Sequence, residues 1–287
     1  MIKDYNCSYD DMAMIDGDLL KSLGLEIPDV YMHADSMAEL SLAVKEQSRE
    51  TFCKLPFCHT VEAEAMGGNI NYGDEKGGPR AKEYVCKSVE DVLKLPEIDF
   101  SRGRIHEVLL ACRTLYEQGE HVVLQVSGPF TILNTLIDIR YVVRSMRKTP
   151  EIMKQVYWKM GDEILKFIEI SENYGADMIS YADSSGSVKI LGPKMAAQVV
   201  EDFTYDFLKK VQRIVEGKRL VLLCPKTTYT LLGTEKAVFR DRKLSVPESY
   251  GEACIEMIGK VPFSGQMCIK GAQNFLNSAI FKEIAIL

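Results

Sequence analysis

"DMISYADSSGSVKILGPKMAAQVVEDFTYDFLKKVQRIVEGKRLVLLCPKTT", residues 177–228, is the stretch that decides the fold. It begins with an apolar run at 178–182, continues with a helical pattern over 192–217 that ends at Gly217, and returns to an apolar run at 220–223. Strands that are apolar throughout, instead of alternating, are typical of a parallel sheet covered by helices. The stretch therefore predicts a strand–helix–strand unit with parallel strands.

The same alternation extends over most of the chain. "HVVLQVSGPF" (121–130) predicts a strand, and a long helix is expected over 148–175, where Thr149 suits the N-cap, Pro150 the first turn and Gly175 the stop. Shorter patterns predict a helix over 105–118, helices before residue 50, and buried strands in "FCKLPF" (52–57), "VPFSGQMCIKG" (261–271) and "IFKEIAIL" (280–287). This order fits either a doubly wound sheet or a (β/α) barrel. No glycine-rich phosphate loop follows any of these strands, which disfavours nucleotide binding.

The composition is that of an ordinary globular protein. The chain has 287 residues, of which 46% are hydrophobic and 26% charged, and its formal net charge is −6. Because there is no basic tract, no nucleic-acid partner is expected, and no apolar run is long enough to cross a membrane. The N-terminal sequence lacks the pattern of a secretory signal, and the eight cysteines include no C-x-x-C pair, so we expect a cytoplasmic location.

Polar and nucleophilic residues follow nearly every expected strand. Both candidate architectures place the active site outside the carboxyl ends of the strands. The residues at those ends are Cys58 and His59, Ser127 and Gly128, Asp183 with Ser184 and Ser185, Cys224 and Lys226, and Gln266 and Cys268. If they converge on one rim, they form a polar pocket that contains thiols and carboxylates. Asp183, directly after an apolar run, is either a functional carboxylate or a helix N-cap.

Several of these residues have a structural alternative. His59 lies beside two carboxylates and could be a base, a metal ligand or a hydrogen-bonded structural residue. Glu62 and Glu64 are two residues apart and cannot share a helical face, so one could point into the pocket while the other is solvated. Cys224 and Cys268 are too far apart in sequence for a compact zinc motif, and each could be an inert buried thiol.

Four blocks of sequence resemble a known superfamily. "PFCHTVEAEAMGG" (56–68), "VSGPFTILNTLID" (126–138), "GADMISYADSSGSVKILGPK" (175–194) and "LLCPKTTY" (222–229) are similar to the uroporphyrinogen decarboxylase superfamily. Within it they most resemble the corrinoid-dependent methyltransferase branch, which includes methylcobamide:coenzyme M methyltransferases. The resemblance implies a (β/α)8 TIM-type barrel formed as a single domain over 1–287, with peripheral N-terminal helices over 1–50. The short N-terminus implies that the first barrel strand is missing or irregular.

The resemblance also implies an activity, the exchange of a methyl group between a small molecule and a corrinoid (cobalamin). No D-x-H-x-x-G corrinoid motif occurs here, so the corrinoid is expected on a separate corrinoid-binding protein. The residues expected to be catalytic are His59, Glu62, Glu64 and Asp183, and those expected to bind substrate are Cys58, Ser127, Ser184 and Lys226. The alternative is a non-catalytic barrel that binds a corrinoid or tetrapyrrole. The donor or acceptor, the direction of transfer and the oligomeric state are left open.

Tetrapyrrole decarboxylation is disfavoured by two departures from the decarboxylases. Those enzymes hold their substrate with an aspartate after the second barrel strand, where this sequence has Cys58. They also carry an arginine-rich N-terminal segment, and nothing before Pro28 resembles it.

A zinc site is expected only in altered form. The methyltransferase branch uses zinc to deprotonate a substrate thiol, and it binds the metal through His-x-Cys after a barrel strand and a cysteine near the C-terminus. Here the His-x-Cys position reads Leu222-Leu223-Cys224. Cys224 matches the family, and Cys268 is a substitute candidate. A third ligand would come from His59 or Glu64, or the protein binds no metal.

Overall fold

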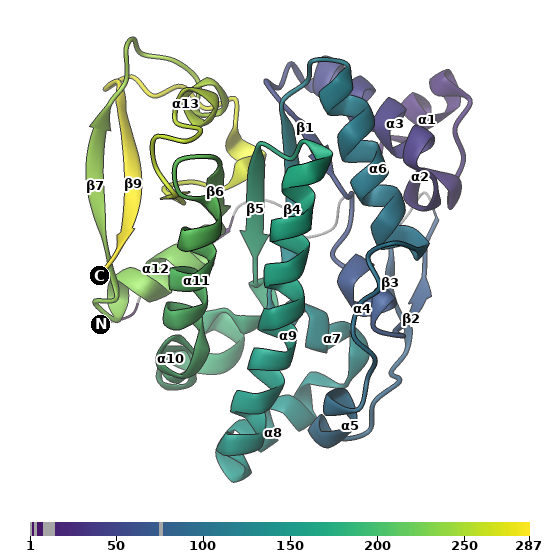
Figure 1. Cartoon of the computed structure of the whole chain (residues 1–287), viewed down its shortest axis with the longest axis vertical. Coiled ribbons are helices and arrows are strands. Elements are labelled where there is room, and N and C mark those ends of the chain that lie inside the picture. The colour runs from purple at the N-terminus through teal and green to yellow at the C-terminus, as the bar shows by residue number, and fades with distance from the viewer. Residues whose placement is uncertain (1, 3–4, 8–14, 75–76) are drawn as a thin grey trace.

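The computed structural model describes residues 2, 5–7, 15–74 and 77–287. Its centre is a seven-stranded sheet in the order β1-β4-β5-β6-β8-β9-β7 (Figure 1). The strands are β1 (Cys53–Leu55), β4 (Val122–Ser127), β5 (Met178–Ala182), β6 (Leu220–Leu223), β7 (Ala237–Lys243), β8 (Phe263–Ser264) and β9 (Ile280–Ile286). A separate small sheet pairs β2 (Asn69–Asn71) with β3 (Arg80–Glu83) in antiparallel fashion.

Five neighbouring strands, from β1 through β4, β5 and β6 to β8, run parallel, as the continuous apolar runs predict. Their register brings Gln125, Ser180 and Leu222 side by side at one level of the sheet. The other two strands form an antiparallel pair, because β9 is antiparallel to β8 and β7 is antiparallel to β9. The prediction of parallel strands therefore holds for one part of the sheet and ends at β8.

Helices cover the outer face of the sheet and extend from its lower end. The longer ones are α3 (Ala34–Ser48), α6 (Gly103–Glu117), α9 (Pro150–Ser171) and α11 (Tyr205–Val215), and in Figure 1 α6, α9 and α11 lie in front of the strands. Four helices begin directly after parallel strands: α4 (Val61–Ala65), α7 (Pro129–Leu136), α10 (Val188–Val199) and α12 (Pro225–Gly233). The remaining helices are α1 (Gly17–Leu23), α2 (Asp29–Met32), α5 (Val89–Leu93), α8 (Ile139–Lys148) and α13 (Tyr250–Glu256). None of the helices described is long and apolar enough to cross a membrane.

The sheet does not close on itself, because β1 and β7 stand at the two ends of the strand order. At the β1 edge, a side chain of α3 takes the hydrogen bonds that a further strand would make. The Ser41 hydroxyl accepts from the Lys54 backbone N–H and donates to the Lys54 carbonyl, both at 3.1 Å. This arrangement satisfies the strand's exposed polar groups. The structure is therefore an open form of the expected barrel, with helix α3 beside β1.

The two faces of the sheet pack against different parts of the chain. Outward side chains such as Leu124 and Ile179 join the large core beneath α6 and α9. Inward side chains near the start of the strands, such as Val123 and Met178, pack with α13 and with Phe281 of β9. Because side chains alternate along a strand, the next inward positions lie toward the carboxyl ends, where no such packing covers them. Two of those positions, Gln125 and Ser180, are polar and the third is Leu222, and all three line the smaller of the cavities described below.

Some sequence-based boundaries differ from the structure. The helix expected over 192–217 begins earlier, at Val188, bends at Gly192 (φ 75°) and passes through a π-helical turn at Val200–Thr204 before α11. Thr149 does precede α9, but its hydroxyl bonds back to the Ser145 carbonyl (3.3 Å) and does not cap the new helix. Strand β7 was not expected, because four of its seven residues, Arg240 to Lys243, are charged. It is an exposed edge strand, which carries little of the apolar pattern that identifies buried strands.

Candidate active site

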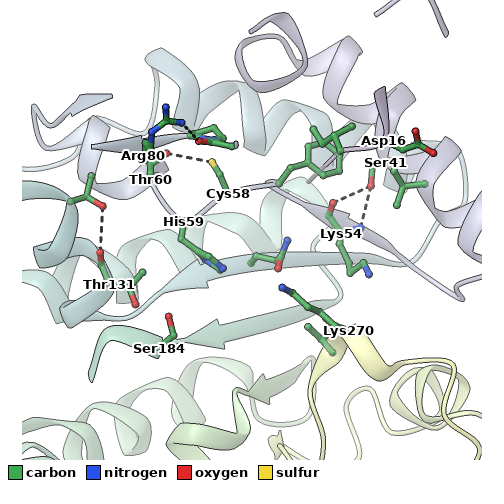
Figure 2. A pocket seen from close by; sticks show the side chains of 18 of the residues that line it. Asp16, Ser41, Lys54, Cys58, His59, Thr60, Arg80, Thr131, Ser184 and Lys270 are labelled. Carbon is green, nitrogen blue, oxygen red and sulfur yellow. Dashed lines mark hydrogen bonds between the residues drawn. The ribbon is translucent and has the colours of Figure 1, made fainter. Parts of the chain in front are cut away.

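Two adjoining cavities lie on the inward face, at the carboxyl ends of the parallel strands. The larger has a volume of about 680 Å³ and is lined by residues of α1, α3, β1, the turn after β1, β4, α7 and the segment 78–84 around β3. The smaller, of about 60 Å³, lies beside Cys224 and Cys268. His59, Gln125, Ser184, Ile269 and Lys270 line both. Figure 2 shows His59 and Lys270 pointing toward each other, and both line the larger cavity together with Lys54.

Six of the predicted site residues lie on these cavities. Cys58, His59 and Ser184 line the larger one, and His59, Ser184, Lys226, Cys224 and Cys268 line the smaller one. The fold thus brings together residues that are far apart in sequence, at the strand ends where they were expected. The remaining four, Glu62, Glu64, Ser127 and Asp183, are not among the described residues that line either cavity.

Glu62 and Ser127 connect two neighbouring strand ends behind the cavity wall. The Glu62 carboxylate, only 2% exposed, accepts the backbone N–H of Ser127 at 2.7 Å. Ser127 is itself 1% exposed. Burial raises the pKa of Glu62, while the hydrogen bonds from Ser127 oppose that rise. The pair therefore joins the turn after β1 to the end of β4.

Arg104 of α6 organises the turn that carries His59. Its guanidinium donates to Cys58 Sγ at 3.1 Å and to Thr60 Oγ1 at 2.8 Å, on either side of His59 in the sequence. It also forms an ion pair with Glu64, with Nε 2.6 Å from a carboxylate oxygen. Sequence reasoning did not identify Arg104. The signal was present, because Arg104 lies on the buried face of α6 that also carries Val108, where an arginine requires partners.

Tyr72 completes this cluster from the other side. Its hydroxyl donates to the second Glu64 carboxylate oxygen at 2.7 Å, and its ring lies 5.3 Å from the Arg104 guanidinium carbon. Burial, followed by the hydrogen bond to Glu64, raises the pKa of Tyr72 to about 12, so the hydroxyl stays a donor at neutral pH. Glu64 is thus bound to Arg104 and Tyr72 while its side chain stays 22% exposed, and it lines neither cavity.

Asp183 joins β5 to α7. One carboxylate oxygen accepts the Thr131 backbone N–H (2.8 Å) and hydroxyl (3.1 Å), and the other accepts the Phe130 N–H (3.2 Å). These are free donors of the first turn of α7, so Asp183 caps a helix that precedes it in sequence. Gly128 leaves room for the carboxylate, because a Cβ there would lie 2.3 Å from the Asp183 Cβ. The "GPFT" and "YAD" blocks therefore contact each other, and this contact connects the end of β5 to the first turn of α7.

Burial raises the pKa of Asp183 to about 6, and the three hydrogen bonds counteract part of that rise. The carboxylate faces the positive end of the α7 dipole, which favours its ionised form. Asp183 does not cap the turn that follows it, as one sequence-based alternative proposed, but caps α7 instead; a functional role for its carboxylate stays a prediction.

The thiols of Cys224 and Cys268 share the small cavity with Cys7 and His59. Burial raises the pKa of Cys224 to about 12 and also raises that of Cys268, which keeps both as neutral thiols at pH 7. Zinc needs three or four convergent ligands with thiols deprotonated. Over residues 15–74, 77–287 and the few before them that are described, no group of three His, Cys, Asp or Glu side chains is arranged to hold a metal ion. Leu222 occupies the position of the expected histidine, so the described residues do not fit a zinc site.

Comparison with known proteins agrees with this architecture. The sequence model of the family described as "Uroporphyrinogen decarboxylase (URO-D)" matches residues 14–237. A solved structure titled "methyltransferase from Methanosarcina mazei" superposes with a TM-score of 0.65 over 79% of this chain and 69% of that one, at 23% identity. The expected TIM-type barrel, in incomplete form, is thereby confirmed.

Curated relatives carry more specific names. "Methylcobamide:CoM methyltransferase MtaA" of Methanosarcina barkeri is 26% identical over 250 residues, which cover 86% of this chain and 71% of the relative. "Methylcobamide:CoM methyltransferase MtbA" of Methanosarcina acetivorans is 25% identical over 215 residues, which cover 73% of this chain and 62% of the relative.

Proposed function

Because the chain belongs to the uroporphyrinogen decarboxylase family, we propose that it is a methyltransferase that exchanges a methyl group between a small molecule and a corrinoid carried by a separate protein. The relatives named as methylcobamide:CoM methyltransferases support the reaction class. The observation that carries the proposal is the pair of adjoining cavities at the carboxyl ends of the strands, with His59 on the wall that they share. Active sites of barrel enzymes occupy that end.

The larger cavity has the size of a small-molecule site. Its volume of about 680 Å³ lies within the range of roughly 300–1,000 Å³ that ligand pockets occupy. Polar groups that can orient a substrate come from different elements: Gln125 from β4, Ser184 after β5 and Lys54 from β1. Lys54 is also ion-paired with Glu50, so it presents a neutralised charge at the cavity wall.

His59 is the candidate for moving a proton. A substrate heteroatom that gains or loses a methyl group changes its proton affinity, and a titratable side chain within reach can compensate. An imidazole nitrogen of His59 can hold or release that proton, and His59 lines both cavities. When bound, the corrinoid supplies a cobalt centre that carries the methyl group.

The other predicted residues divide into those on the cavities and those behind the wall. Cys58, Ser184 and Lys226 are positioned to contact substrate. Glu62, Glu64, Ser127 and Asp183 support the wall through the contacts described above, and a direct catalytic or substrate-binding role for them stays a prediction. A zinc site at Cys224 and Cys268 receives no support from the geometry, because no group of three possible ligands is arranged to hold a metal ion among the described residues.

Two other functions receive less support. A barrel that only binds a corrinoid or tetrapyrrole is not favoured, because the curated relatives are named as enzymes. For uroporphyrinogen decarboxylation, the position of the substrate-holding aspartate is Cys58, whose sulfur contacts Arg104. We therefore expect no conversion of uroporphyrinogen to coproporphyrinogen in an anaerobic assay.

The experiment that tests the proposal follows cobalt absorbance. The purified protein is mixed under anaerobic conditions with methylcobalamin or cob(I)alamin and a panel of thiols, methylamines and methoxylated aromatic compounds. We expect methylation or demethylation of the corrinoid with at least one member of the panel. Binding of a corrinoid without turnover across the whole panel would instead favour the binding protein, and no spectral change at all would refute the proposal.

A further inference from the structure

We propose that Arg104 is a positioning residue of this site. It fixes the turn from Cys58 to Thr60, and therefore the direction of the His59 side chain, relative to the segment that follows β2. The inference rests on the proposed function only where it concerns catalysis. The positional part follows from contacts that exist in the protein without any ligand.

The Arg104 guanidinium is buried and donates hydrogen bonds to three different side chains. Its side chain is 1% exposed, and separate nitrogens point at Cys58 Sγ, Thr60 Oγ1 and the Glu64 carboxylate. A planar guanidinium that donates in fixed directions restricts all of its partners at once. Because Cys58 and Thr60 flank His59, the backbone on both sides of the imidazole is held by one side chain.

The Arg104 cluster also includes a residue that directly follows β2. Tyr72 directly follows β2, and its hydroxyl bonds to the carboxylate that pairs with Arg104. The antiparallel partner of β2 is β3, and Arg80 and Ala81 of β3 line the larger cavity. Two walls of that cavity, the turn with His59 and the β2–β3 sheet, are thus connected through Arg104 and Glu64.

A lysine cannot replace this guanidinium. The Arg104→Lys variant keeps the positive charge and can keep one partner, but it loses the fixed directions toward the other two. The turn can then rotate, and the imidazole of His59 leaves its direction into the cavity. If transfer depends on His59, we expect kcat to fall by about 100-fold with little change in KM, because a displaced catalytic group affects the reaction more than substrate binding.

The direct test is the imidazole spectrum of protein labelled with ¹⁵N-histidine. The chain contains four histidines, and His59→Asn identifies the resonance of interest. In Arg104→Lys we expect the His59 signals to move, while those of His121, which pairs with Asp177 at the opposite end of β4, stay in place. The matched control is Arg113→Lys on the same helix, whose guanidinium lies over the Tyr174 ring at 4.2 Å and makes no contact with the turn.

The outcomes separate this inference from the proposed function, because the spectrum requires no substrate. Unchanged His59 signals in folded Arg104→Lys overturn the positioning role, whether or not the protein transfers methyl groups. Moved His59 signals support it even if no methyl transfer is found. If Arg104→Lys does not fold, Glu64→Gln removes the anchoring charge with less disruption, and the same comparison of His59 with His121 decides.

Discussion

Replacement of Gly128 by alanine should disrupt the contact between Asp183, which follows β5, and the first turn of α7, which follows β4. Gly128 has an ordinary φ of −80°, so alanine introduces no backbone strain there. Its Cβ would, however, lie 2.3 Å from Cβ and 2.5 Å from Cγ of Asp183. Carbon atoms in contact stay about 3.5 Å apart or more, so the aspartate must retreat by roughly 1 Å.

The magnitude follows from what that retreat disrupts. The bond from the Thr131 N–H to Asp183 is 2.8 Å long, and a shift of about 1 Å takes it beyond hydrogen-bond range. Loss of a helix cap costs about 1 kcal/mol, and overpacking a filled site costs about 1–3 kcal/mol more. We expect Gly128→Ala to lower the free energy of unfolding by about 3 kcal/mol. At about 2.1 cal/mol/K of unfolding entropy per residue, that corresponds to a fall in Tm of roughly 5 °C for 287 residues.

The assay is a double-mutant cycle measured by urea denaturation. Asp183→Gly removes the clashing atoms, so Gly128→Ala made in that background should cost less than about 1 kcal/mol, leaving a coupling energy near 2 kcal/mol. The nearest remaining obstacle is the Tyr181 hydroxyl, at 2.8 Å from the new Cβ. Equal costs of Gly128→Ala in both backgrounds would refute the reasoning, because the clash would then not involve Asp183.

Three further predictions concern pH, metal and proton transfer. Because burial raises the pKa of Asp183 from its usual 3.8 to about 6, its contribution to stability is complete below pH 3.8 and is lost as the pH rises through 6. The free energy of unfolding of the wild type should therefore fall relative to Asp183→Asn over that interval, and a constant difference would contradict the pKa. Leu222→His should increase bound zinc toward about one ion per chain, measured by metal analysis. Cys224→Ala should remove that gain, whereas zinc that survives both Cys224→Ala and Cys268→Ala would exclude these thiols as ligands. His59→Gln should lower the rate of methyl transfer about 100-fold with an unchanged Tm, and an unaffected rate would remove His59 from the mechanism.

Three of the correctly predicted strands, β4, β5 and β6, are buried over most of their length. β4, β5 and β6 are buried on both faces, and each residue of "LVLL" at 220–223 is buried. Continuous burial leaves a continuous apolar pattern that can be recognised in the sequence. β7 lies at an edge and is mostly exposed, so its seven residues carry no comparable pattern.

Candidate residues were recognised where a polar or titratable side chain directly follows a predicted strand. His59, Ser184 and Lys226 follow strand ends in sequence, and strand ends of a parallel sheet meet at one edge, so they reach the cavities. Arg104 follows no strand. Its side chain meets Cys58, 46 residues away, only because α6 packs beside α4.

The roles of the carboxylates also depended on packing. Asp183 and Thr131 are 52 residues apart, and nothing local to "YADSSG" shows that its carboxylate caps the helix after the preceding strand. Likewise, Glu62 and Glu64 diverge from one short helix to Ser127 and Arg104, and neither reaches the larger cavity.

The sequence by itself determined the alternation of strands and helices, the parallel core of the sheet and the end of it at which polar residues gather. Helices and strands leave residue patterns with the periods of their own backbone geometry, and these patterns can be recognised within ten to twenty residues. The tertiary structure alone decided that the barrel stays open beside α3, that Arg104 contacts the residues on both sides of His59, and that Cys224 and Cys268 line one cavity. Each of these depends on distances between side chains that are far apart in sequence, and those distances are set only when whole elements pack against one another.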